Sequence, residues 1–221
     1  IKIRRADLRD DLISALITAK EASERLNDDE LLSMILLLIV AGHETTVNLI
    51  ASGMLALLEH PDQLERLRSD PTLIKPAVEE LLRFTAPVET GTERFATEEV
   101  ELAGVKIAQG DLVIAAIASA NRDESQFADP DTLDITREPN RHLAFGQGIH
   151  FCLGASLARL EGQTAIKTLL ARTSDLRLAV DPSALRWRSG LILRGLKALP
   201  VSFTPAAPRV ARTELAETLC P

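Results

Sequence analysis

The chain has 221 residues, of which 46% are hydrophobic, so it can bury a substantial core. Its formal net charge of −7 argues against nucleic-acid binding, because a phosphate backbone requires a basic surface. Two cysteines, Cys152 and Cys220, are too few for a disulfide framework or a four-cysteine zinc site and fit a reducing compartment. The charged opening residues are unlike a secretory signal, and the apolar run from Met34 to Gly42 is shorter than the ~20 residues that span a bilayer. We therefore expect a cytoplasmic protein without a membrane span.

The first part of the chain predicts helices. Residues 7–25 have the amphipathic spacing of a helix. Asn27 and Glu30 have the spacing of a capping box, which predicts a long helix from this point to about Glu59. Three prolines indicate where shorter segments begin: a helix at Pro61, a stretch at Pro71 and a helix after Pro76.

The second part mixes short strands with irregular chain. Alternating residues rich in Val and Ile between 87 and 116 predict short strands, with turns at Gly104 and Gly110. Residues 121–142 are rich in Asp, Pro and Asn and have no clear periodicity, and so long a connection often carries function. A strong helical pattern follows at 155–172. The last predicted strands lie near residues 176–180, 191–195 and 199–203.

The segment FGQGIHFCLG, residues 145–154, places Cys152 among glycines directly before a predicted helix. Unpaired N–H groups and the helix dipole favour a thiolate there, which can act as a nucleophile or a metal ligand. The glycines allow the backbone to approach a flat or bulky ligand closely. His150 is poorly placed as a base for Cys152 if both lie on a helix. At this point a buried structural cysteine beside a glycine-rich turn explains the segment equally well.

The spacing Phe145-x-x-Gly148-x-His150-x-Cys152-x-Gly154 resembles the haem-binding signature of the cytochrome P450 family in its bacterial form. The resemblance implies that Cys152 is the axial thiolate ligand of the iron in haem b (iron protoporphyrin IX), a ligand that favours O–O cleavage. It also implies that Phe145 packs near the thiolate side of the ring and that His150 contacts a propionate. The cofactor-binding residues expected in this segment are Phe145, Gly146, Gly148, His150, Cys152 and Gly154.

A second motif, AGHETT at residues 41–46, interrupts the most apolar helix of the chain with polar groups. Buried polar groups need partners, and a bent helix with threonines bonding back to carbonyls would supply them. The resemblance implies a catalytic role instead. In the family this helix crosses the distal face of the haem, and Glu44 and Thr45 match the acid–threonine pair that delivers protons to dioxygen. Ala41 and Gly42 would leave room for oxygen beside the cofactor.

Two further sites have ordinary alternatives. Glu80 and Arg83 share a helical face and by themselves indicate only a weak surface pair. The resemblance implies that they are buried and bind Arg137, a structural role in which three residues hold the irregular segment to the core. Arg94 matches a position that pairs with a haem propionate, a geometry that suits a guanidinium. Its alternative is an ordinary arginine at the edge of a strand.

The resemblance extends from about Asp7 to Phe203 but covers only the C-terminal half of such a protein. It implies that residues 1–203 are the C-terminal part of a single cytochrome P450 domain, followed by a flexible tail at 204–221. The fold implied is mostly α with small β-sheets, and it contains the long central helix, the Glu-x-x-Arg helix, the cysteine loop and the following helix. Segments expected to face a substrate are 34–40, 87–91 and 190–193.

The function implied is a haem-thiolate monooxygenase that inserts one oxygen atom of O2 into a small organic substrate. Electrons would come from a ferredoxin or similar donor with its NAD(P)H-dependent reductase, docked near basic residues. The candidates for that contact are Arg141, Arg159, Lys167 and Arg172. One alternative is a truncated, non-catalytic fragment or interaction module, whose apolar helix faces drive association. Another is a cysteine-nucleophile hydrolase or transferase, whose base would lie far from Cys152 in the sequence.

Overall fold

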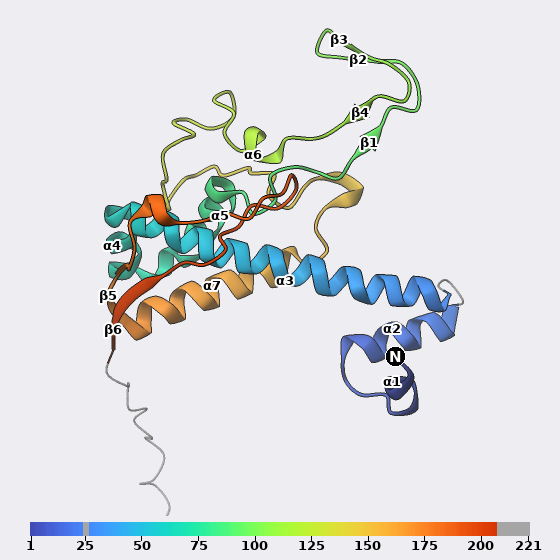
Figure 1. Ribbon diagram of the computed structural model, residues 1–221, viewed down its shortest axis with the longest axis horizontal. Coiled ribbons are helices and arrows are strands. Elements are labelled where there is room, and N and C mark those ends of the chain that lie inside the picture. The colour runs from blue at the N-terminus through green and yellow to red at the C-terminus, as the bar shows by residue number, and fades with distance from the viewer. Residues whose placement is uncertain (24–26, 207–221) are drawn as a thin grey trace, which may run out of the picture. The chain divides into compact units, whose positions relative to one another are not determined.

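The structure is a computed structural model that describes residues 1–23 and 27–206, in two compact units, Ile1–Val47 and Asn48–Pro221 (Figure 1). The α-helices are α1 (Lys2–Ala6), α2 (Leu12–Ser23), α3 (Asp28–Glu59), α4 (Pro61–Ser69), α5 (Ile74–Thr85), α6 (Ile117–Ala120) and α7 (Ala155–Arg172). The strands are β1 (Arg94–Phe95), β2 (Val100–Leu102), β3 (Val105–Ile107), β4 (Leu112–Val113), β5 (Thr173–Leu178) and β6 (Val201–Pro205). The prediction of a mostly helical fold with small β-sheets is confirmed.

The first unit contains α1, α2 and the N-terminal part of α3. Its buried side chains include Ile17, which is 1% exposed, and Leu31, which is 0% exposed. The capping box is confirmed at the start of α3. The backbone N–H of Asn27 donates to Glu30 Oε2 at 2.7 Å, and the N–H of Glu30 donates to Asn27 Oδ1 at 2.9 Å. Two N–H groups at the N-terminal end of the long helix are thereby satisfied, which explains why the helix begins here.

The helix predicted at 7–25 begins five positions later than expected. Residues 7–11 form the connection between α1 and α2, and the carboxylate of Asp11 accepts a hydrogen bond from the backbone of Ser14 at 2.8 Å. The hydroxyl of Ser14 in turn accepts from the backbone of Arg9 at 2.9 Å. An acidic residue that binds the free N–H groups of a first turn ends the helical pattern on its N-terminal side, even where the apolar spacing continues.

Helix α3 exposes most of its apolar side chains within the first unit. Leu36 is 59% exposed, Leu37 is 60% exposed and Ile39 is 61% exposed. Among the described residues, α3 is also the helix that is long and apolar enough to cross a membrane. The core helix of a soluble protein passes the same test, because it too must be apolar over its length. The exposed residues show that the described chain leaves this face of α3 without apolar cover.

The second unit is built around α5, α7 and the C-terminal part of α3, which lie together in Figure 1. Gly162 of α7 permits their close approach, because a Cβ atom there would lie 3.1 Å from Leu49 Cδ2 and 3.4 Å from Val78 Cγ1. The fully buried apolar residues of this core include Leu49, Leu57, Val78, Leu81 and Ile166. Burying such side chains contributes about 1.5–3 kcal/mol each, so this packing is what positions the segments that follow.

The strands of the second unit form three separate two-stranded antiparallel sheets, β1–β4, β2–β3 and β5–β6. The predicted turns are confirmed, since Gly104 has a φ of 79° and Gly110 a φ of 88°, values that favour glycine. The β2–β3 hairpin is exposed along its length and extends away from the helices of this unit in Figure 1. The strand predicted near 191–195 is reduced to an isolated bridge between Val88 and Leu193.

Two further boundaries differ from the predictions. Helix α5 begins at Ile74 and includes Pro76 in its first turn, where the missing N–H of a proline costs nothing. Helix α6, at 117–120, directly follows the stretch 87–116 that predicted strands, and the sequence did not predict it. Strand β6 extends to Pro205, and from residue 207 onward the predicted tail, with Cys220, lies outside the described residues.

Candidate functional site

Cys152 lies in a loop that is closed on itself by backbone hydrogen bonds. The N–H of Cys152 donates to the carbonyl of Phe145 at 2.8 Å, and the N–H of Gly146 donates to the carbonyl of Leu143 at 2.8 Å. A short 3-10 turn, Gly148–His150, connects the two ends of the loop. The carbonyl of Cys152 accepts from the N–H of Ala155 at the start of α7, at 3.3 Å. These bonds fix the sulfur relative to the helix that follows.

The three glycines of the loop serve different purposes. Gly146 has a φ of 69° and Gly148 a φ of 72°, so both occupy the left-handed region that side chains disfavour. Gly154 has an ordinary φ of −87°, but a Cβ atom there would lie 4.0 Å from the sulfur of Cys152. The first two glycines therefore permit the turn, whereas a side chain at Gly154 would begin at ordinary contact distance from the sulfur.

Aromatic rings lie beside the cysteine loop. Phe145 is buried at 9% exposure, and its ring lies 6.0 Å from that of His142 and 6.4 Å from that of Phe151. The guanidinium of Arg159 is stacked over the ring of Phe145, at 4.4 Å from the ring centroid. Cys152 itself is half-buried and packs against the main core of the second unit. One side of Cys152 is therefore covered by the apolar core of this unit.

Arg159 and His142 both bind Glu79 of α5. Arg159 Nε donates to Glu79 Oε1 at 2.7 Å, and His142 Nε2 lies 3.0 Å from Glu79 Oε2. Burial raises the pKa of the Glu79 carboxyl, but hydrogen bonds from His142 and Arg159 outweigh it and lower that pKa to about 2. The same hydrogen bond raises the pKa of Arg159. Arg159, predicted as a docking residue, therefore has an internal partner and anchors the cysteine loop to α5.

The outer side of the loop is apolar and exposed. Ile149 is 98% exposed, Leu153 is 89% exposed and Phe151 is 53% exposed, beside an exposed His150. Large side chains of this kind are rarely left in water together unless something covers them. The described residues contain no cluster of three His, Cys, Asp or Glu side chains able to hold a bare metal ion. A single thiol with an apolar surround fits a flat cofactor that supplies the other ligands of its metal.

Glu80 and Arg83 lie at the centre of a buried ion-pair network that also contains Arg137. Both Glu80 and Arg83 are 0% exposed. Arg83 donates twice to Glu80, from Nη2 to Oε1 at 2.7 Å and from Nε to Oε2 at 2.8 Å, and Arg137 Nε donates to Oε1 at 3.1 Å. The structure thus brings together the three residues that the sequence singled out. Such pairing is what makes buried charges tolerable.

The same network holds the irregular segment in place. Arg83 Nη1 donates to the carbonyls of Asn121 at 2.9 Å and Pro130 at 2.8 Å, and its Nη2 donates to that of Thr132 at 3.2 Å. The side chain of Asn121 in turn accepts a hydrogen bond from the backbone of Leu143, at 2.7 Å. A segment without helix or strand must satisfy its backbone groups by other means, and here buried side chains do so. The chain is thereby guided from α6 to the cysteine loop.

The AGHETT motif lies in the first unit, within an uninterrupted α3. The hydroxyl of Thr45 donates to the carbonyl of Ala41 at 2.5 Å, which is the backward bond that the structural alternative predicted. Glu44 is half-buried, whereas Ala41 and Gly42 are exposed. A Cβ atom on Gly42 would have no neighbour within 4 Å. Within this unit, therefore, packing does not require a glycine at position 42.

The remaining predicted residues belong to the second unit. Arg94 is exposed on β1, opposite Val113. The two segments expected to face a substrate there, 87–91 and 190–193, are neighbours. The N–H of Glu89 donates to the carbonyl of Ile192 at 2.8 Å, one of the bonds that join them. Arg94 therefore has the exposure that a propionate contact needs, on a strand that follows the segment 87–91 in the sequence.

Comparison with known proteins identifies the family. Residues 2–176 match the model of the family described as Cytochrome P450. The chain belongs to the cytochrome P450 family. It is 53% identical over 198 residues to Cytochrome P450 107B1 of Saccharopolyspora erythraea, covering 90% of this chain and 49% of that protein. To the polyketide biosynthesis cytochrome P450 PksS of Bacillus subtilis it is 52% identical over 201 residues, covering 91% of this chain and 50% of the relative.

Solved P450 structures have the same fold. The tirandamycin C-bound P450 monooxygenase TamI superposes with a TM-score of 0.88 at 47% identity, covering 92% of this chain and 51% of that one. The predicted family is therefore confirmed, and so is the P450 fold. The chain spans about half the length of the curated relatives it matches.

The Glu79–His142–Arg159 cluster was not predicted. Its members are separated by 63 and 80 residues, and no spacing rule connects them. In a P450 the only sequence signal would have been position, because His142 precedes the cysteine segment and Arg159 lies one turn into the helix that follows it.

Proposed function

We propose that this chain supplies the C-terminal half of a haem-thiolate monooxygenase, which inserts one oxygen atom of O2 into an organic substrate. The observation that carries the proposal is the half-buried thiol of Cys152, held at the start of α7 by its hydrogen-bonded loop and edged with exposed apolar side chains. Haem b, when bound, supplies the redox-active iron at which dioxygen is activated. One relative acts in polyketide biosynthesis, so a polyketide is the first substrate class to test.

The residues around the cofactor have distinct roles in this proposal. Cys152 provides the thiolate, and Phe145 packs beside it and keeps water from that side. The left-handed Gly146 and Gly148 allow the loop backbone to lie close to a flat ring. Arg94 and His150, both exposed, bind the propionates. These contacts orient the cofactor, and none requires a further metal ligand from the chain.

Glu44 and Thr45 move protons to the oxygen-binding side. The Thr45 hydroxyl already donates its proton to the carbonyl of Ala41, so its oxygen is oriented to accept a hydrogen bond from elsewhere. Glu44 lies next to it and provides a carboxyl group that exchanges protons with solvent. The exposed Ala41 and Gly42 leave room for dioxygen beside this pair.

Electrons come from a ferredoxin or similar donor with its NAD(P)H-dependent reductase, in the cytoplasm. The donor docks on the side of the cysteine loop and α7. Because Arg159 is bound to Glu79, the basic residues that remain for this contact are Arg141, Lys167 and Arg172, all of them exposed. Opposite charges at such a surface mainly raise the rate of association.

The test is a reduced carbon-monoxide difference spectrum of the haem-loaded chain. A thiolate ligand gives a strongly red-shifted band, and Cys152→Ala abolishes it. Cys220→Ala is the matched control, because it removes the chain's other cysteine and is expected to leave the band unchanged. A band that survives Cys152→Ala would refute the ligand assignment.

A role as an interaction module is the second candidate. It is favoured by the exposed apolar side chains of α3 and of the cysteine loop, which suit contact with another polypeptide. The two candidates differ in one respect that is easily measured: only the monooxygenase requires haem.

A further inference from the structure

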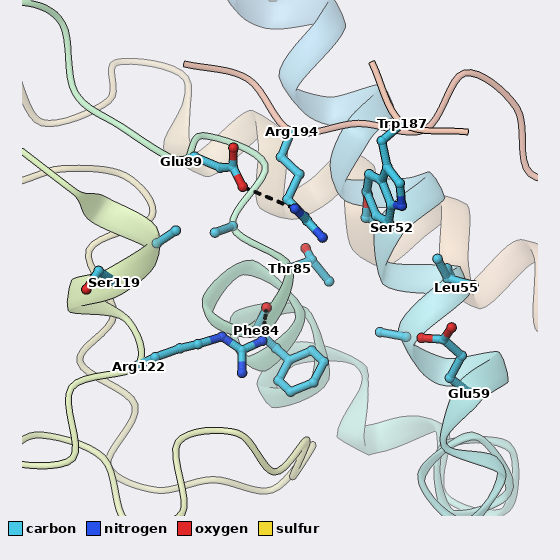
Figure 2. A pocket seen from close by; sticks show the side chains of 13 residues that line it. Ser52, Leu55, Glu59, Phe84, Thr85, Glu89, Ser119, Arg122, Trp187 and Arg194 are labelled. Carbon is cyan, nitrogen blue, oxygen red and sulfur yellow. Dashed lines mark hydrogen bonds and ion pairs between the residues drawn. The ribbon is translucent and has the colours of Figure 1, made fainter. Parts of the chain in front are cut away.

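A cavity of about 410 Å³ lies within the second unit and has a mixed aromatic and charged lining (Figure 2). Its walls come from the C-terminal part of α3, the end of α5 with the residues that follow it, α6 with the nearby Arg122, and residues Trp187 and Arg194. None of the residues of the cysteine loop lines it. A volume of this size falls in the range of small-molecule sites, which is roughly 300–1,000 Å³.

Ser52 of α3 lines this cavity with a hydroxyl that lacks a partner. Ser52 is only 3% exposed, and its Oγ atom forms no hydrogen bond with any described residue. A buried hydroxyl is normally satisfied, most often in a helix by a carbonyl one turn earlier. The hydroxyl of Ser52 is therefore available to an atom bound in this cavity.

Two arginines stacked on aromatic rings form the opposing sides of the cavity. The guanidinium of Arg194 lies 4.2 Å from the ring centroid of Trp187, and that of Arg122 lies 4.5 Å from the centroid of Phe84. In Figure 2, Arg194 and Trp187 lie on one side and Arg122 and Phe84 on the other. Stacked in this way, both side chains are held flat and keep N–H donors at their edges.

The two arginines of the cavity offer N–H donors to an anion, although the lining also contains the carboxylates of Glu59 and Glu89. Arg194 Nη1 donates to Glu89 Oε1 at 3.2 Å. Arg122 Nη1 donates to Asp131 Oδ1, and Arg122 Nη2 donates to the carbonyl of Phe84 at 2.9 Å. A guanidinium has five N–H donors, so each arginine has donors beyond these bonds. Glu89 and Arg194 neutralise each other, so a carboxylate would bind through the remaining N–H donors of Arg194 rather than through a net positive charge. The other lining carboxylate, Glu59, is exposed and therefore screened by solvent.

The cavity lies on one side of the pairing between the two predicted substrate segments, 87–91 and 190–193. Val88 bridges Leu193, and neighbouring residues of extended chain point to opposite sides. The lining includes Glu89 and Arg194 but neither Val88 nor Leu193. A ligand in this cavity is thus separated, by the paired backbones of the two segments, from a molecule that contacts the side chains of Val88 and Leu193.

We propose that this cavity is a binding site for a small aromatic carboxylate. The ring lies between Trp187 and Phe84, the carboxylate accepts hydrogen bonds from Arg194, and the hydroxyl of Ser52 donates to the same carboxylate. The site needs no haem, so its failure and that of the monooxygenase proposal are separate results.

Trp187 makes the proposal directly measurable. It is the only tryptophan, and the chain has no tyrosine, so intrinsic fluorescence reports this wall of the cavity alone. The probes are benzoate, its neutral analogue benzamide, and the benzylammonium cation, each titrated into the purified 221-residue chain. We expect saturable quenching by benzoate at concentrations about tenfold lower than for benzamide, the difference that one charged hydrogen bond of ~1.4 kcal/mol provides.

Two variants and one control locate the binding. Arg194→Gln is expected to remove the preference for benzoate over benzamide, and Ser52→Ala to weaken benzoate severalfold. Arg186→Gln, an exposed arginine of the same segment outside the lining, leaves both unchanged. Circular dichroism checks that each variant is folded. If Arg194→Gln unfolds, Arg194→Lys takes its place. Because lysine keeps the charge, Arg194→Lys is expected to retain part of the preference for benzoate over benzamide. Equal binding of benzoate and benzamide, tighter binding of benzylammonium, or no quenching by benzoate would each overturn the proposal.

Discussion

At the scale of single residues, Glu80 accepts hydrogen bonds from its own helix and from three residues of the irregular segment 121–142. Besides Arg83 and Arg137, the backbone of Asp134 donates to it at 3.0 Å and Asn140 Nδ2 at 3.0 Å. We predict that Glu80→Ala lowers the free energy of unfolding by about 3–5 kcal/mol, because Arg83 is left charged and buried without its carboxylate. Urea denaturation followed by circular dichroism measures this loss.

The neighbouring Glu79 provides a matched control. It lies on the same helix and also binds an arginine, but its side chain is 27% exposed rather than 0%. Glu79→Ala is expected to cost less than Glu80→Ala, since solvent partly screens its ion pair and no fully buried charge is left behind. If both variants lose the same amount, burial is not what makes the Glu80 network important.

Glu79 also predicts how stability depends on pH. Its carboxyl has a pKa of about 2 in the folded chain, lowered from 4.5 because the hydrogen bonds from His142 and Arg159 outweigh the effect of burial. A lowered folded-state pKa gives stability that is present above the unfolded value and is lost as the pH falls. We predict that part of the loss of stability from pH 4.5 towards pH 2 disappears in Glu79→Gln. Urea midpoints across that window test this, and identical slopes in both proteins would contradict it.

Which site residues the sequence reveals depends on whether chemistry or packing places them. The spacing of Glu80 and Arg83 and the segment around Cys152 belong to recognisable motifs, so their positions followed from the sequence. The partners of Glu79 did not, since only the folded arrangement of α5, α7 and the loop brings them within 3.0 Å. Ser52 looked like an ordinary helix residue, because nothing in a sequence shows that a hydroxyl will lack a partner.

At the scale of elements, the contact between α3 and residues 187–196 depends on one glycine. A Cβ atom on Gly195 would lie 2.0 Å from Oδ1 of the buried Asn48, far inside contact distance. We predict that Gly195→Ala lowers the free energy of unfolding by about 1–3 kcal/mol, the usual cost of overpacking, because the buried side chain of Asn48 would have to move. Chemical denaturation measures the change.

Gly190 serves as the comparison for this prediction. It lies in the same segment, and a Cβ atom there would meet only the carbonyl of Leu193 at 3.4 Å. Gly190→Ala is expected to be nearly neutral. Equal effects of the two substitutions would show that the segment responds to the loss of glycine flexibility rather than to a clash with Asn48.

Elements with strong local signals were predictable, and those set by tertiary contacts were not. Helix α7 spans the predicted residues 155–172, and α3 begins at the predicted capping box. By contrast, the stretch near 191–195 has the composition of a strand but makes only one bridge, because its neighbour, the segment at 87–91, is itself short and irregular. Strand propensity predicts a suitable surface and does not supply a partner.

At the scale of the whole molecule, the sequence identified the family and also that only half of such a protein is present. The structure adds where the uncovered surface lies in each unit: on α3 in the first, and on the cysteine loop and α7 in the second. Leu157 and Leu160 of α7 are 57% and 61% exposed. In a chain that spans half of its relatives, these residues are the places where the other half of a P450 would be expected to bind.

The last prediction follows from that surface. We expect the purified chain alone to self-associate and to bind a hydrophobic dye, because apolar patches of this extent seldom stay in water. Co-expression with the N-terminal half of Cytochrome P450 107B1, a relative that is 53% identical over the matched region, should lower dye binding and increase haem uptake. Light scattering and the carbon-monoxide difference spectrum measure the two effects.

A charged variant separates apolar association from other causes. Replacing Leu36 and Leu37, both about 60% exposed on α3, by glutamate should reduce self-association of the chain alone and also weaken rescue by the N-terminal half. The control replaces Glu98 and Glu99, exposed residues before the β2–β3 hairpin, by glutamine. This variant should change neither the self-association of the chain nor its rescue by the N-terminal half. If the unmodified chain is monomeric and binds haem unaided, its apolar surface is not a site for the missing half. The exposed leucines would then need no partner to remain stable in water.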